Sequence, residues 1–138
     1  MEIVAPYSWA VVYLLAFVIV TLFTSAIVGA RKASAKLTAG GNPDNNYEDG
    51  VYRINRAHQN AVENAALIAI ALVAAILAGV SPWWTHLLMG LFLVFRLLHT
   101  FILVMNIGAE QQSLRTFAYV ASWACNLVLA SMAIVALV

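Results

Sequence analysis

The sequence carries very little charge. Only 9% of its 138 residues are Asp, Glu, Lys or Arg, whereas 64% are hydrophobic and the mean hydropathy is +0.90. A soluble domain averages about 25% charged residues. This chain cannot supply an aqueous surface, so the composition predicts an integral membrane protein, and the length predicts one domain over residues 1–138.

Cysteine and clustered basic residues are equally scarce. Cys125 is the single cysteine, which excludes an intrachain disulfide. The net charge of +1 without a basic cluster gives no sign of a nucleic-acid partner. The three histidines (His58, His86 and His99) lack paired ligand spacing, and the sequence has neither a Ser-His-acid arrangement nor a phosphate-binding glycine loop. We therefore predict no metal site.

Lys and Arg are absent from the amino-terminal part of the chain before Arg31. A signal peptide needs a basic segment before its short apolar core. The uncharged stretch from Ile3 to Ala30 is instead long enough to cross a bilayer, which takes about 20 residues. We expect a first membrane span there and not a cleaved signal.

Long apolar runs predict four transmembrane helices, over about residues 6–30, 52–79, 83–106 and 113–138. Residues 31–51 are rich in Gly, Asn and Asp and should form an irregular loop. The other two connections are short. The fold class expected is all-α, a membrane four-helix bundle of up-down-up-down topology.

The basic residues indicate how the bundle lies in the membrane. They flank the first loop or lie at the last connection: Arg31, Lys32, Lys36, Arg53, Arg56 and Arg115. The opposite side has no Lys or Arg. The positive-inside rule therefore predicts a cytoplasmic loop and outward-facing termini. A short helical chain without retention signals is compatible with a bacterial inner membrane.

A polar run leads directly into the second span. Arg53, Arg56, Asn60 and Glu63 follow at intervals of 3, 4 and 3 residues, which places them on one helix face. Charged side chains in the mouth of a bilayer are unfavourable, and a chain that has them there usually binds something polar.

The third and fourth spans carry polar stripes of their own. Arg96, His99 and Thr100 share a face of the third span, with Arg96 ~15 Å from its cytoplasmic end. Glu63 lies at a similar depth in the second span, so we expect the two charges to pair or to share a hydrogen-bonded ligand. The stripe of the fourth span consists of Arg115, Tyr119, Ser122 and Asn126.

These stripes have two interpretations. Ser122, Asn126 and Ser131 are typical of residues that hold helices together, and the Arg and Glu residues could form a structural ion network. The alternative is a zwitterionic ligand. Arg binds carboxylates bidentately, Glu suits an ammonium group, and a nearby positive charge favours a thiolate. Glutathione has all three groups, although an amino acid or an anionic lipid head group would satisfy much of the pattern.

The run Arg53-x-x-Arg56-Ala57-His58-x-Asn60-x-x-Glu63-Asn64 resembles the signature of the MAPEG family, the membrane-associated proteins in eicosanoid and glutathione metabolism. Arg96-x-x-His99-Thr100 and Arg115-x-x-x-Tyr119 resemble its second and third motifs, in the same order. The resemblance covers nearly the whole chain. It implies a homotrimer that binds glutathione between protomers, in a cleft open to the cytoplasmic side.

The resemblance also implies roles for individual residues. Arg115 would stabilise the glutathione thiolate, and Tyr119 would add a hydrogen bond to the sulfur or to the leaving group. The remaining predicted site residues are Lys32 (or Arg31 beside it), Arg53, Arg56, Asn60, Glu63, Arg96, His99 and Thr116.

This chain differs at three positions from family members that make eicosanoids. Those members often have Arg, Tyr and Ser where this chain has Gln59, Leu103 and Thr116, respectively. These differences disfavour prostaglandin E synthase activity. The leading hypothesis is a glutathione transferase or peroxidase that acts on a lipophilic electrophile or hydroperoxide. A non-catalytic scaffold that binds lipid or glutathione is the alternative. A transporter is disfavoured because the outer halves of the spans are almost entirely apolar.

Overall fold

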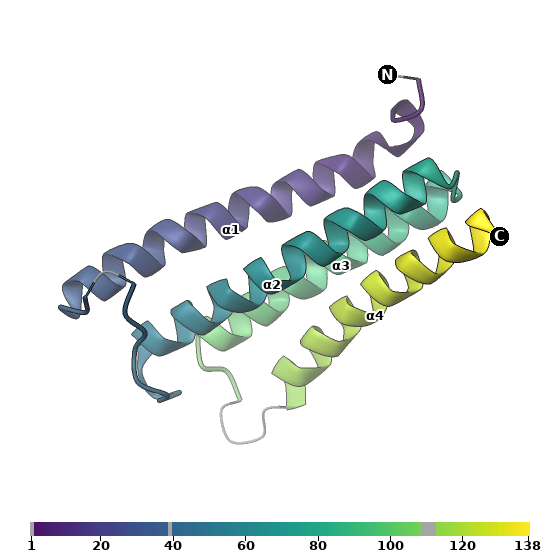
Figure 1. Ribbon diagram of the computed structural model, residues 1–138. Helices are drawn as coiled ribbons and strands as arrows, with labels where there is room; N and C mark the ends of the chain where they lie inside the picture. The colour runs from purple at the N-terminus through teal and green to yellow at the C-terminus, as the bar shows by residue number, and fades with distance from the viewer. Residues whose placement is uncertain (1, 39, 109–112) are drawn as a thin grey trace.

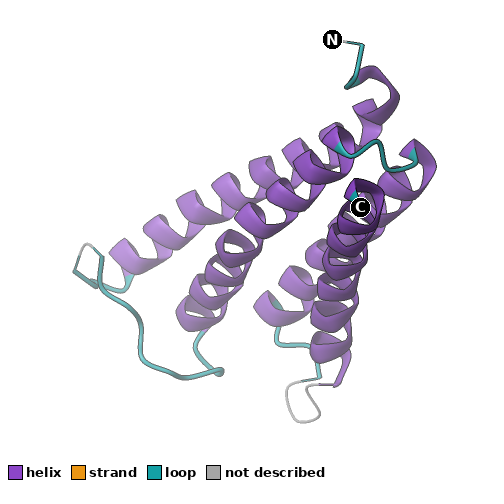
Figure 2. Ribbon diagram, turned by 45° about the vertical axis from the view of Figure 1, so that its right-hand side comes forward, coloured by secondary structure: helices purple, strands orange, loops and turns teal. Residues whose placement is uncertain are grey.

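The computed structural model describes residues 2–38, 40–108 and 113–138. These residues form four long helices and no strand: α1 (Ser8–Ser34), α2 (Gly50–Leu77), α3 (Pro82–Val104) and α4 (Ser113–Leu137), with a 3-10 turn (Ala5–Tyr7) before α1. The helices run side by side in Figure 1. Figure 2 shows that loops connect one helix to the next. All four are long and apolar enough to cross a membrane. This confirms the predicted all-α architecture with four spans.

The helices alternate in direction, so both chain ends lie at one end of the bundle (Figure 1). The carboxyl ends of α1 and α3 and the amino ends of α2 and α4 lie at the other end, which we call the polar end. The predicted connection between the third and fourth helices includes residues 109–112, which lie outside the described residues.

Local chemistry explains where the helices begin and end. The Asp49 carboxylate accepts a hydrogen bond of 2.9 Å from the Val51 amide and caps α2. Gly79 (φ 70°) and Asn106 (φ 55°) follow the ends of α2 and α3 in left-handed conformations, which Gly and Asn tolerate best. The α1 helix continues to Ser34, beyond the predicted end at Ala30, because cations in a last helical turn are favourable.

Small and aromatic side chains fill the core. Phe17 of α1 meets Phe92 of α3 edge-on, with ring centroids 5.2 Å apart. The Tyr7 hydroxyl donates a hydrogen bond of 2.6 Å to the Val80 carbonyl and fixes the start of α1 against the α2–α3 turn. Of the four helices, α1 is the least buried by the rest of the chain, so most of its apolar surface is left for lipid or another chain.

Candidate functional site

Cationic side chains from three helices lie at the polar end. Arg31 and Lys32 lie in the last turn of α1, Arg53 and Arg56 at the start of α2, and Arg115 at the start of α4. The alternation of helix direction puts these segments at the same end of the bundle although they are far apart in sequence (Figure 1). Asp44, Glu48 and Asp49 of the loop before α2 lie at this end too, so it carries charges of both signs.

Arg96 lies deeper, between α3 and α4, and is almost completely buried at 2% exposure. Its guanidinium carbon lies 5.0 Å from the ring centroid of Tyr119 and 5.7 Å from that of Phe92. None of its three guanidinium nitrogens has a hydrogen-bond partner among the described residues. Aromatic faces thus surround a positive charge that no carboxylate neutralises.

The predicted direct pairing of Arg96 with Glu63 is wrong for the chain as described. The Glu63 carboxylate lies 3.8 Å from Nη1 of Arg56, and no other ion pair occurs among the described residues. The two residues of the pair are seven apart on α2, two helical turns, and the long Arg56 side chain spans that distance. Glu63 and Arg56 are both well exposed.

His99 connects α3 to the start of α4. Its Nδ1 lies 3.2 Å from the Arg115 carbonyl oxygen, and its ring centroid is 5.5 Å from that of Tyr119. A carbonyl oxygen only accepts, so Nδ1 must carry the hydrogen. His99 Nε2 is buried without a partner among the described residues. In the neutral ring this nitrogen is an acceptor.

Tyr47, in the loop before α2, is a site residue that the sequence analysis missed. Its ring centroid lies 4.7 Å from the guanidinium carbon of Arg115 and 5.0 Å from the ring centroid of Tyr52, which it meets at 90°. Tyr47 thus contacts both α4 and α2. Two features of the sequence could have indicated Tyr47: it is the one aromatic residue of the predicted loop, and it lies close to Asp49, which caps α2.

The Arg53 side chain donates hydrogen bonds to backbone carbonyls. Its Nη1 donates to Tyr47 (2.7 Å) and Glu48 (2.9 Å), and its Nε donates to Val104 at the end of α3 (3.2 Å). These bonds attach the loop to α2 and α3. Arg53 therefore acts as a structural clamp in this conformation, although the sequence analysis placed it among ligand-binding residues.

A polar cavity of about 360 Å³ lies between the loop and the first turns of α2. Arg56 and Gln59 contribute to its wall, and Nη1 of Arg56 lies 3.4 Å from Oε1 of Gln59. Tyr52 and Asn55 complete the α2 side, and Tyr47 belongs to the loop side. The cavity offers hydrogen-bond donors and acceptors beside a guanidinium group.

Three predicted residues make no side-chain hydrogen bond or ion pair among the described residues. Lys32 is half-buried on α1, and Thr116 is exposed on α4. Asn60 is half-buried, and its backbone carbonyl accepts a 2.8 Å bond from the Asn64 side chain. Among the described residues, no group of three His, Cys, Asp or Glu side chains could hold a metal ion.

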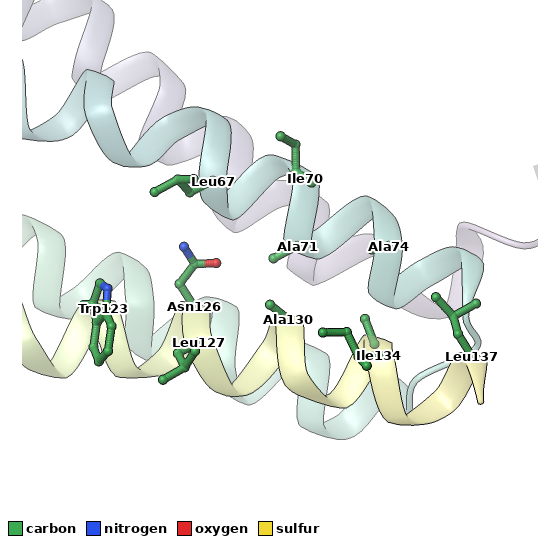
Figure 3. A pocket seen from close by; sticks show the side chains of 11 residues that line it. Leu67, Ile70, Ala71, Ala74, Trp123, Asn126, Leu127, Ala130, Ile134 and Leu137 are labelled. Atoms are coloured by element: carbon green, nitrogen blue, oxygen red, sulfur yellow. The ribbon is translucent and has the colours of Figure 1, made fainter.

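An apolar groove of about 380 Å³ runs between α2 and α4 (Figure 3). Its walls are mostly Ala, Leu and Ile, and the small side chains Ala71 and Ala130 leave space at its floor. Asn126 projects into the gap between the helices as the one amide among these apolar side chains. The groove begins at Trp123, about 12 Å along α4 from Arg115 at 1.5 Å per residue.

Fold and site together define a multi-pass membrane protein of four helices with a cationic, aromatic-lined cluster at one end. The model of the MAPEG family matches residues 10–135, nearly the whole chain, and the chain belongs to that family. A comparison with curated proteins gives no match. The family includes glutathione transferases as well as non-catalytic members.

Proposed function

We propose that this protein is a membrane-bound glutathione transferase, with peroxidase activity as a second outcome of the same chemistry. The observation that carries the proposal is the buried guanidinium of Arg96, which has no hydrogen-bond partner among the described residues. A charge at this depth is unfavourable by about 3 kcal/mol. An anionic substrate at the polar end would supply the missing negative charge.

The groups of the cluster match those of glutathione. Arg56 and Arg96 would act on its carboxylates, Arg96 largely through its field, because a buried charge is poorly screened. The Glu63 carboxylate, which is exposed, would bind the ammonium group. Nε2 of His99 is a buried acceptor for an amide hydrogen.

Arg115 is the proposed activator of the thiol. Its guanidinium makes no hydrogen bond among the described residues, so its in-plane donors are free for a sulfur. A positive charge beside a thiol lowers the thiol pKa from about 8.5. Tyr119 belongs to the same cluster and would donate its hydroxyl hydrogen to the sulfur or to the leaving group.

The chemistry proposed is nucleophilic attack. The thiolate of the substrate glutathione forms a C–S bond to an electrophilic carbon. In an aryl halide the halide departs with the bonding pair, whereas in an unsaturated aldehyde the C=C π pair moves towards the carbonyl and the resulting enolate takes up a proton. With a hydroperoxide, two glutathione molecules give the disulfide, an alcohol and water. Holding both reactants at one site supplies proximity.

The lipophilic reactant would come from the membrane. The groove between α2 and α4 is apolar and runs along α4 from Trp123 to Leu137, so it suits an acyl or aryl chain (Figure 3). We place the polar end on the cytoplasmic side, because Lys and Arg concentrate there.

We also propose that the chain assembles as a homotrimer. Lys32 lies on α1 and makes no ion pair with the described residues of its own protomer, and Lys32 of a neighbouring copy would complete the site. The exposed apolar surface of α1 leaves room for such packing.

The test is turnover in lipid nanodiscs with glutathione and a panel of apolar acceptors: an aryl halide, an unsaturated aldehyde and a fatty-acid hydroperoxide. We expect conjugate or alcohol from wild-type protein and a loss of at least about 100-fold in Arg115→Ala, as for removal of a group that stabilises a reacting anion. Glutathione binding without turnover on every acceptor would reject the enzyme and favour a scaffold.

A further inference from the structure

The contact between Tyr47 and Arg115 joins two segments that no helix connects directly. Tyr47 comes from the loop before α2 and is 40% exposed, whereas Arg115 lies in the first turn of α4. The ring of Tyr47 faces the guanidinium carbon at 4.7 Å from the ring centroid. Arg115 makes no side-chain hydrogen bond or ion pair among the described residues. Within the part of the chain that the structure describes, the Tyr47 ring is therefore the group that orients Arg115.

An aromatic ring attracts a guanidinium through its delocalised positive charge and not through a hydrogen bond to an oxygen or nitrogen. The guanidinium has five N–H donors, and the ring face pairs none of them with such an acceptor. Arg115 is held by Tyr47 and still presents its donors to an anion. A carboxylate in the place of Tyr47 would occupy those donors and offset the charge.

Tyr47 is itself held in place by two contacts. Its ring lies perpendicular to that of the buried Tyr52, and its carbonyl accepts the 2.7 Å bond from Arg53. The same Arg53 donates to Val104 at the end of α3. Arg115 is thus connected through Tyr47 to two helices other than its own.

We propose that Tyr47 is a positioning residue for Arg115, which orders the guanidinium for the thiolate before the substrate arrives. The inference rests on the proposed function of Arg115. Tyr47 touches the guanidinium and not the reacting atoms, so its contribution is preorganisation. Its removal leaves Arg115 present but mobile.

The test compares Tyr47→Leu, which removes the ring, with Tyr47→Phe, which keeps it. Glutathione thiolate is followed by ultraviolet difference absorbance across pH, and turnover is separated into kcat and KM. The matched control is Tyr13→Leu, which removes an aromatic ring from α1 at a position away from the polar end. Far-ultraviolet circular dichroism and size-exclusion profiles establish that each variant is folded.

We expect Tyr47→Leu to lower the thiolate signal at neutral pH by about threefold to tenfold, the range of a cation–π contact. Its thiol titration should move to higher pH, kcat should fall more than KM rises, and Tyr47→Phe should stay within about twofold of wild type. The inference would be overturned if folded Tyr47→Leu kept the wild-type thiolate signal and the wild-type kcat. Loss of both in Arg115→Ala would show that the proposed role of Arg115 still holds in that case. A wild-type protein without thiolate would overturn the proposed function, and this inference with it.

Discussion

Arg96 of α3 and Tyr119 of α4 are in contact, with the guanidinium carbon 5.0 Å from the ring centroid. The contact links two residues that belong to separate sequence motifs. It also places Arg96 against an aromatic face and not against a carboxylate, so the positive charge remains uncompensated within the described chain.

Replacing Arg96 by Leu should separate stability from function. The change removes a buried charge at a cost of two cation–π contacts, with Tyr119 and Phe92, so we expect the ligand-free protein to become more stable by about 1–2 kcal/mol. Glutathione affinity should fall at least about tenfold, since the field of Arg96 is lost. Thermal unfolding in detergent with and without glutathione measures both effects. A less stable variant with unchanged affinity would make Arg96 a structural residue.

Arg53 and Arg56 should behave differently although both lie in the first motif. Arg53→Gln removes three hydrogen bonds to backbone carbonyls, so we expect a loss of about 2–4 kcal/mol of stability. Amide hydrogen exchange over residues 44–49 should accelerate. Arg56→Gln is the matched comparison. It should leave stability nearly unchanged and weaken glutathione binding, because its one ion pair is exposed. Equal effects of both substitutions would contradict the division of roles.

His99 offers a test of its two nitrogens. The variant His99→Asn places an amide donor near the position of Nδ1, so it should retain the bond to the Arg115 carbonyl. The longer side chain of His99→Gln places its amide near the position of Nε2 instead. We expect His99→Gln to lose that bond, worth about 1 kcal/mol, and to loosen the start of α4. Hydrogen exchange in the first turns of α4 distinguishes the variants. Identical exchange in both would show that the bond does not hold α4.

The apolar groove should determine the response to acceptor size. Ala130→Leu fills part of its floor, so KM for a long-chain hydroperoxide should rise about tenfold or more while KM for glutathione stays constant. Ala136→Leu is the matched control, because Ala136 is exposed on the same helix and does not line this groove. Equal changes in both variants, or a change in KM for glutathione, would place the acceptor elsewhere.

Hydropathy and helical spacing were enough to predict the fold and the shared faces. Apolar runs predict four spans because a bilayer imposes their length, and the spacing of Arg96 and His99 predicts that both face the same neighbour. The structure has both residues buried against α4, at Tyr119 and at the Arg115 carbonyl.

Contacts that depend on loops and on long side chains could not be predicted in the same way. Glu63 had two possible Arg partners, and spacing alone did not favour the one on its own helix. The contact of Tyr47 with Arg115 depends on how the irregular loop folds back onto α2, which has no periodic signature. The bonds of Arg53 to backbone carbonyls of the loop and of α3 are likewise visible only in three dimensions, and its role in ligand binding stays a prediction.

The central claim is that Arg115 stabilises the glutathione thiolate at the polar end. The most direct measurement is ultraviolet difference absorbance on mixing glutathione with purified protein at neutral pH, for wild type, Arg115→Lys and Arg115→Ala. We predict a thiolate signal from wild type, a reduced signal from Arg115→Lys, which keeps the charge without the planar fork, and none from Arg115→Ala. A folded wild-type protein without the signal, or an Arg115→Ala variant with the full signal, would contradict the claim.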